Sequence, residues 1–265
     1  MIKFKNINIK IFSSLLFFIV IIFTFSSTQT LAQKSRSQFK KELLNLNKKL
    51  KLFSEDHLAS CERELGNKSY PLTTSFQDLK GDSYEVTILN KHDAEWLFYC
   101  FATDKNIPIK KYPKNYCWVK SHFITTWAEN LYGIKMAKAW VLAKEKSALN
   151  PLGNPNVFWS YHTVPIVAGL NAQEKPFDYY NSYYAFDIAL DNKVSTFGKW
   201  MANFDQSKRG RGDMFLTNRF QYVALLDPKT QSTSLRKSFN KFDEDLFQKD
   251  LTEMWKIERG EISPP

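Results

Sequence analysis

Apolar residues recur along the chain at two kinds of spacing, and each kind predicts a type of secondary structure. Spacing by three and four residues predicts amphipathic helices, whereas alternation and short β-branched runs predict strands. Helices are expected over residues 33–53, 55–65, 94–103, 117–131, 196–204 and 234–257. Strands are expected over residues 84–89, 138–143, 157–168, 183–188 and 220–226, and a loop over 67–81. Helices at both ends of the chain and strands between them predict an α+β fold.

Two local signals mark helix ends. Ser54 stands before the second predicted helix, where a serine side chain caps the first backbone N–H groups. Gly133 follows the helix predicted over residues 117–131, at the position where a glycine ends a helix.

The first 32 residues have a different pattern from the rest of the chain. Lys3, Lys5 and Lys10 precede an uncharged apolar run, Ile11 to Phe25, and small residues precede Gln33. This order predicts a cleaved secretory signal peptide over residues 1–32. The alternative is an uncleaved membrane anchor, but the run is shorter than the roughly 20 residues that a spanning helix needs. We therefore expect a secreted or periplasmic protein with no stable membrane insertion after cleavage.

Composition and charge narrow the classes of function. Of 265 residues, 43% are hydrophobic and 15% aromatic, which excludes a disordered chain. The 37 Lys and Arg outnumber 27 Asp and Glu, but they are scattered and form no motif typical of nucleic-acid binding. Three cysteines are too few for a disulfide scaffold, and no paired Cys/His spacing predicts a zinc site. We expect no nucleic-acid partner, no metal and no cofactor.

Cys117 is the first candidate for chemistry. It follows a Pro- and Lys-rich loop and begins a predicted helix. A helix start favours the thiolate form of a cysteine, and its free N–H groups can stabilise an oxyanion. The alternative is an inert buried thiol, which describes most single cysteines.

His162 and Asp187 lie in consecutive predicted strands. Neighbouring strands can place an acid beside a histidine, and a buried acid between Phe186 and Ile188 needs such a partner. Cys, His and Asp in this order match the layout of a papain-like or transglutaminase-like nucleophile site. His122 is the rival base, but five residues at about 100° each turn it away from the face of Cys117, so we interpret it as structural.

Three segments carry a resemblance to a known family. They are Asn115-Tyr116-Cys117-Trp118-Val119-Lys120-Ser121-His122, Trp159-Ser160-Tyr161-His162, and Ala185-Phe186-Asp187-Ile188-Ala189-Leu190. Together they resemble the active-site segments of bacterial protein glutaminases, which are secreted protein-glutamine deamidases. The family's Pro-Ser after the aspartate is replaced by Ile188-Ala189, and its Tyr-Ala-Arg-like run is replaced by Trp118-Val119-Lys120.

The resemblance implies a papain/transglutaminase-like fold, with the nucleophile helix packed on an antiparallel sheet. It implies that Cys117 is the nucleophile, His162 the general base and acid, and Asp187 the residue that orients the imidazole. It also implies hydrolysis of protein-bound glutamine to glutamate and ammonia, without a cofactor, on proteins or peptides with exposed glutamine. The candidate substrate-binding residues are Trp159, Ser160, Tyr161 and Trp118.

The remaining predictions concern the parts around this site. Residues 91–265 are assigned to the catalytic domain, and residues 33–90 are either a pro-region or an ordinary supporting subdomain. Cys61 and Cys100 are expected to form a disulfide, because two leftover cysteines often pair in an oxidising compartment. Two further alternatives stay open: a transglutaminase or cysteine protease with the same triad, and a non-enzymatic exported binding protein.

Overall fold

The computed structural model describes residues 54–77, 81, 83–103, 116–143, 148–151, 158–175, 178–204, 211–219, 224–226, 233–235, 249–254, 256–257 and 261–262, with positions 41, 44, 45 and 48. The predicted signal peptide lies outside the described residues, as does most of the helix predicted over residues 33–53, whose four described positions are helical. Residues Asn45–Pro265 form one compact unit.

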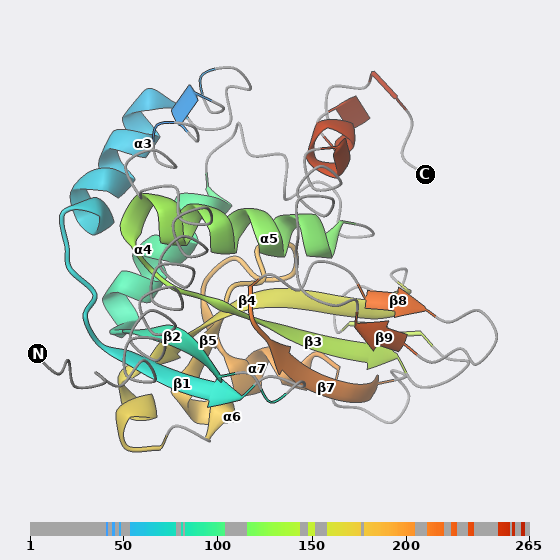
Figure 1. Ribbon diagram of the computed structural model, residues 1–265. Coiled ribbons are helices and arrows are strands. Elements are labelled where there is room, and N and C mark those ends of the chain that lie inside the picture. The colour runs from blue at the N-terminus through green and yellow to red at the C-terminus, as the bar shows by residue number, and fades with distance from the viewer. Residues whose placement is uncertain are drawn as a thin grey trace, which may run out of the picture. The chain divides into compact units, whose positions relative to one another are not determined.

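A seven-stranded sheet forms the centre of this unit among the described residues (Figure 1). Its main path runs β1 (Thr73–Gln77), β2 (Ser83–Leu89), β4 (Tyr161–Gly169), β3 (Ala137–Ala143) and β7 (Arg211–Thr217). Beside this path, β5 (Tyr183–Ala185) pairs with β4 and with β6 (Ser195–Thr196). The pairs are antiparallel except for β2 with β4, which is parallel. A separate two-stranded sheet joins β8 (Ala224–Leu226) and β9 (Thr233–Leu235).

The helix that begins with Cys117 lies across this sheet beside β4 (Figure 1). The Ser121 hydroxyl donates a hydrogen bond of 2.8 Å to the Thr163 carbonyl and so ties the helix to the strand that carries His162. The helices are α3 (Glu55–Cys61), η1 (Glu62–Gly66), α4 (Lys91–Ala102), α5 (Cys117–Trp127), η3 (Ala128–Tyr132), η4 (Leu170–Gln173), α6 (Tyr179–Ser182) and α7 (Phe197–Ala202). The α+β prediction, with the Cys117 helix packed on a largely antiparallel sheet, is confirmed.

Several predicted elements are confirmed with small shifts at their ends. They are the helices over 55–65, 94–103, 117–131 and 196–204, and the strands over 84–89 and 138–143. Both end signals act as expected, since Ser54 accepts a hydrogen bond from the His57 N–H and Gly133 takes a φ of 73°. The central strands β3 and β4 are buried along nearly their whole length, and burial on both faces accounts for the mostly apolar sequence of β3.

Other predictions are wrong in an informative way. The loop expected over 67–81 contains β1, an edge strand whose exposed positions are polar. The strand expected over 183–188 ends at Ala185, because the Asp187 side chain accepts the N–H groups of Ala189 and Leu190 and turns the chain. The helix expected from residue 234 does not begin there, since residues 233–235 form β9. The strand expected from residue 157 is described as a strand only from Tyr161.

The predicted N-terminal segment contributes to the same sheet. β1 and β2 fall within residues 33–90, and β2 pairs with β4, so this part of the segment supports the strand of His162. Cys61 at the end of α3 and Cys100 in α4 are joined by a disulfide, with their Cα atoms 5.9 Å apart. Within the described part of the chain, no helix combines the length and the apolar character needed to cross a bilayer.

Candidate active site

Cys117 is the first residue of α5 and the only cysteine outside the disulfide. Its side chain is partly exposed. The preceding residue, Tyr116, has φ 66° and ψ 24°, a left-handed conformation that costs a residue other than glycine about 1–3 kcal/mol. Tyr116 supplies no side-chain cap to the helix. The thiol is therefore reachable, and it stands beside first-turn N–H groups that receive no cap from Tyr116.

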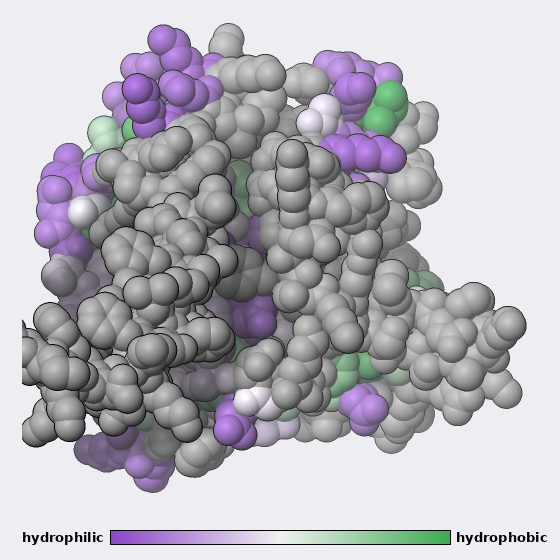
Figure 2. All heavy atoms as spheres, viewed as in Figure 1, coloured by the Kyte–Doolittle hydropathy of each residue, from purple (hydrophilic) through white to green (hydrophobic). Residues whose placement is uncertain are grey.

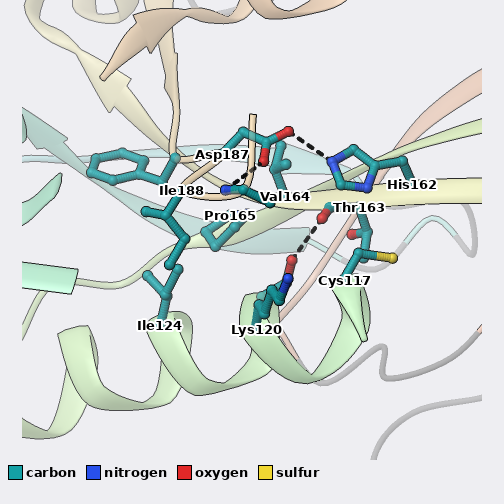
Figure 3. Close-up of a pocket in the computed structure, with 12 residues that line it drawn as sticks. Cys117, Lys120, Ile124, His162, Thr163, Val164, Pro165, Asp187 and Ile188 are labelled. Atoms are coloured by element: carbon teal, nitrogen blue, oxygen red, sulfur yellow. Dashed lines mark hydrogen bonds and ion pairs between the residues drawn. The ribbon is translucent and has the colours of Figure 1, made fainter. Parts of the chain in front are cut away.

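His162 and Asp187 form a buried pair opposite this helix end (Figure 3). The Nε2 atom of His162 lies 2.7 Å from Oδ2 of Asp187, and each side chain is 2% exposed. His162 is the second residue of β4, whereas Asp187 comes two residues after β5 ends. Because β5 pairs with β4, the sheet brings the two residues together as the sequence predicts.

The Asp187 carboxylate has a complete set of hydrogen-bond donors. Oδ1 accepts from the backbone N–H groups of Ala189 and Leu190, at 3.1 Å each. Oδ2 accepts from His162 and also from the indole N–H of Trp200, at 2.8 Å. Burial disfavours the charge of this carboxylate, but the charge of His162 and these donors outweigh burial and hold its pKa below the ordinary value.

The same balance raises the pKa of His162. Burial of the ring disfavours the imidazolium, but the Asp187 carboxylate, through charge and hydrogen bond, together with Cys117 raises the pKa to about 9. The other ring nitrogen, Nδ1, is buried and has no hydrogen-bond partner within standard distance among the described residues. Since Nε2 is bonded to Asp187, Nδ1 is the nitrogen left to exchange a proton with Cys117.

Aromatic rings surround the imidazole. Trp159 stacks on it with centroids 4.2 Å apart and planes 11° apart, while the rings of Trp200 and Phe204 lie 6.1 and 5.9 Å away. A positive imidazolium is attracted to the face of such a ring. The stack therefore fixes the orientation of His162 and favours its protonated form.

The four predicted substrate-binding residues occupy different environments. Trp159 is 6% exposed and packs against His162, and Ser160 is exposed. Trp118 and Tyr161 are partly exposed, with ring centroids 6.1 Å apart, and Tyr116 adds a third ring 5.5 Å from Trp118. These three rings form an aromatic row beside Cys117.

A small pocket adjoins the three predicted catalytic residues (Figure 3). Cys117, His162 and Asp187 line it together with apolar side chains, which include Ile124, Val164, Pro165, Phe186 and Ile188. Its volume of about 210 Å³ includes space that is open to solvent, so the pocket is an open hollow rather than an enclosed cavity.

His122 makes structural contacts, as the helix geometry predicts. Its ring is buried, with Nδ1 3.4 Å from Lys138 Nζ and Nε2 3.3 Å from the Thr126 hydroxyl. Burial, and then the positive charges of Lys138 and Arg219, lower its pKa well below the ordinary value. The described residues contain no group of three or more His, Cys, Asp or Glu that could hold a metal ion.

Three residues at the site have no signal in the sequence. Trp200 lies 13 residues after its partner Asp187. Asp250 and Glu253 accept hydrogen bonds from Trp118 and Tyr116, which lie 132 and 137 residues earlier. Local patterns carry no information on contacts at these separations.

Residues 74–204 match the family model described as glutaminase, and this range contains Cys117, His162 and Asp187. The region that holds these three residues belongs to the glutaminase family. It is therefore a hydrolase of the glutamine amide, and the predicted family and enzyme class are confirmed. No curated protein matches the chain.

Several solved structures resemble parts of this glutaminase. The NMR structure of protein-glutaminase from Chryseobacterium proteolyticum is 16% identical, with a TM-score of 0.41, over 65% of this chain and 86% of that one. A crystal structure of protein-glutaminase has the same identity and coverage and a TM-score of 0.43. A crystal structure of pro-protein-glutaminase is 16% identical, with a TM-score of 0.41, over 75% of this chain and 68% of that one. Family membership rests on the matched residues rather than on these scores.

Proposed function

We propose that this glutaminase is an exported enzyme that deamidates protein-bound glutamine through a thioester on Cys117. The observation that carries the proposal is the buried His162–Asp187 pair, at 2.7 Å, facing the helix end that presents Cys117. An imidazole held in this way can shuttle protons for a neighbouring thiol.

The resting charges suit the first step. A His162 with a pKa of about 9 carries a proton at neutral pH, and Asp187, with a lowered pKa, is ionised. An imidazolium beside a cysteine stabilises the thiolate, which is the nucleophilic form. His162 is thus protonated and Asp187 is ionised before substrate arrives.

Acylation then proceeds in two bond changes. The Cys117 sulfur forms a bond to the carboxamide carbon, and the resulting oxyanion accepts the Cys117 backbone N–H and one further donor. His162 gives its proton to the amide nitrogen, the C–N bond breaks, and ammonia leaves. The products of this half-reaction are ammonia, a γ-glutamyl thioester and a neutral imidazole.

Deacylation restores the enzyme. Neutral His162 takes a proton from water, and the hydroxide oxygen attacks the thioester carbon. The C–S bond breaks, glutamate is released, and the thiolate and imidazolium re-form. The net reaction converts one side-chain amide and one water into one carboxylic acid and one ammonia.

Two features support a side chain of a protein as the substrate. The pocket beside Cys117, His162 and Asp187 has mainly apolar walls, which suit the methylene groups of a glutamine side chain. Trp118 and Tyr161 stand partly exposed next to Cys117, where they can pack against the backbone of a bound chain.

Ammonia release from a glutamine-containing protein tests the proposal, with Cys117→Ala and His162→Ala compared with wild type. The exposed His92 serves as a matched control, so His92→Ala should keep full activity. Excess methylamine in the same reaction distinguishes the acyl acceptor. Products carrying only the mass change from amide to acid support hydrolysis. Stoichiometric methylamine adducts would make the chain a transglutaminase, and equal activity of wild type and Cys117→Ala would refute the thioester.

Export is supported by the pattern of residues 1–32 and by the Cys61–Cys100 disulfide, a bond that persists in oxidising compartments. The test is the N-terminal sequence of protein recovered from outside the cytoplasm of expressing cells. A chain that begins at Gln33 supports cleavage, whereas an intact N-terminus in the membrane fraction supports the anchor.

A further inference from the structure

The C-terminal helical residues 249–254 contact both neighbours of the nucleophile. The Trp118 indole N–H donates to Asp250 Oδ2 at 3.1 Å, and the Tyr116 hydroxyl donates to Glu253 Oε1 at 3.2 Å. Trp118 and Tyr116 are the residues directly after and before Cys117. One short helical segment therefore holds both sides of the turn formed by Tyr116, Cys117 and Trp118, which we call the nucleophile turn.

The spacing of residues in this segment places Asp250 and Glu253 on one side and anchors the segment in the core. Asp250 and Glu253 are three residues apart, so they lie on the same face of a helix. Leu251, Met254 and Ile257 repeat at the same spacing and are 2%, 1% and 4% exposed, so they anchor the segment in the core. Among the described residues of this part of the chain, Lys249, Thr252 and Lys256 are exposed. In Figure 2 the coloured atoms at the place of the C-terminal helix are mostly hydrophilic, with a smaller hydrophobic group beside them.

The nucleophile turn has a particular need for such support. Tyr116 holds a left-handed backbone conformation that other residue types than glycine adopt only where the surroundings impose it. Burial and the carboxylates of Glu253 and Asp250 raise the pKa of the Tyr116 hydroxyl to about 12, so it stays protonated and donates its hydrogen bond. Trp118 extends the connection to Tyr161, which precedes the base His162.

We propose that Asp250 and Glu253 are positioning residues of the glutaminase site, which hold Tyr116 and Trp118 so that the strained turn presents Cys117 to His162. They act through their acceptor oxygens rather than through substrate contact. The family match ends at residue 204, so this device lies in a part of the chain outside the matched range. The inference rests on the proposed role of Cys117 as nucleophile.

Two double variants separate positioning from charge and from folding. Asp250→Ala with Glu253→Ala removes both acceptors, whereas Asp250→Asn with Glu253→Gln removes both charges but keeps an acceptor oxygen at each position. Glu174→Ala is the matched control, because Glu174 is exposed and follows the far end of β4, roughly 20 Å from His162. Each protein is measured for kcat and KM of ammonia release from a short glutamine peptide, for the rate of iodoacetamide alkylation of Cys117, and for Tm.

The Ala pair should lower kcat by roughly 10–100-fold, since small misplacements of a nucleophile have effects of that size. It should slow alkylation as well, with a smaller change in KM. The Asn/Gln pair should restore kcat to within about threefold of wild type, because a neutral oxygen still accepts the hydrogen bond. Tyr116→Phe, which removes the donor from the other side, should reproduce part of the loss in kcat if the Ala pair does not fold.

Two results would overturn the proposal. One is an Ala pair, or a Tyr116→Phe variant, with a lower Tm but unchanged kcat and alkylation, which would mean a purely structural contact. The other is an Asn/Gln pair as inactive as the Ala pair, which would mean that charge is what matters. If wild type releases no ammonia at all, the proposed function fails, and the alkylation rates alone still decide whether the acids position Cys117.

Discussion

Replacing Asp187 by Asn should move the alkaline limit of activity by more than two pH units. The pKa of His162 is about 9, against an ordinary value of 6.5, and the charge and hydrogen bond of Asp187 are its largest raising causes. The gap between these two values corresponds to about 3 kcal/mol of preference for the imidazolium. Without the carboxylate, burial of the ring is opposed only by Cys117 and by the stacked Trp159, and the pKa should fall to 6.5 or below.

The surroundings of Asp187 also show why an amide is a poor replacement. Four donors converge on the carboxylate, two on each oxygen. An asparagine side chain has one acceptor oxygen and one NH₂ group, so it can match only one of the two pairs. The other pair of donors then faces the NH₂ group of the asparagine, which cannot accept their hydrogen bonds. Either the hydrogen bonds from Ala189 and Leu190 are lost, or His162 takes the wrong tautomer.

The assay is the dependence of kcat/KM on pH for ammonia release, from about pH 5 to about pH 10. As pH rises, wild type should lose activity near pH 9, where His162 deprotonates. The Asp187→Asn variant should lose activity earlier in the same titration, with an alkaline limit at or below about pH 7. Near pH 7.5 the variant should retain roughly a hundredth of wild-type activity or less. Asp191→Asn is the matched control, since Asp191 is a neighbouring carboxyl that accepts from Ser195 and its replacement should leave the alkaline limit near that of wild type. An Asp187→Asn profile that still falls near pH 9 would refute this account of His162.

Three further predictions follow from the same structure. Trp200→Phe leaves the buried Asp187 with one donor fewer and should lower the free energy of unfolding by about 1.5–3 kcal/mol and reduce kcat several-fold. Trp140→Phe is the control, because it removes an indole hydrogen bond of equal length to the neutral hydroxyl of Thr217. It should lower stability without lowering kcat. Equal kcat values for the two variants would contradict the role of Trp200. The His162–Asp187 pair should make stability depend on pH, because a raised histidine pKa stabilises the folded state below about pH 6.5 and this contribution is lost as pH rises through about 9. Urea unfolding should show that decline in wild type and a smaller one in His162→Gln, and equal declines would exclude His162 as the cause. Reduction of the Cys61–Cys100 disulfide, which spans 39 residues, should lower the free energy of unfolding by about 4 kcal/mol, with no effect of reductant on a Cys61→Ala, Cys100→Ala double variant. A wild type that is insensitive to reductant in the same unfolding assay would contradict the bond.

The sequence predicts the elements that depend on local pattern. The apolar stripe of α5 and the glycine after η3 locate the Cys117 helix, and the apolar residues that follow Lys138 locate β3. β1 was not predicted, because an edge strand with one buried residue among its five does not produce a clear alternation. The early end of β5 depends on a side chain that bonds to backbone two and three residues further on, which competes with the strand.

The residues of the site also fall into those that a local pattern predicts and those that it does not. Cys117, His162 and Asp187 carry a recognisable order and spacing, and the structure brings the last two into contact. Trp200 does not appear in any motif, because its role depends on the direction of one N–H in a folded helix. Asp250 and Glu253 lie in a stretch predicted as an ordinary helix, and their partners are more than 130 residues away in the chain. Long-range partners of this kind become visible only when the sheet and helices are assembled.

The stack of Trp159 on His162 gives this enzyme an optical reporter of its own chemistry. An indole 4.2 Å from the imidazole and nearly parallel to it experiences a full positive charge when the base is protonated and none when it is neutral. The fluorescence of Trp159, isolated as the difference between wild type and Trp159→Phe, should therefore titrate with His162 rather than with the bulk protein. The same signal should change transiently during a single turnover, when the thioester has formed and the imidazole has given up its proton. The lifetime of the acyl-enzyme can thus be followed with unlabelled protein and natural substrate.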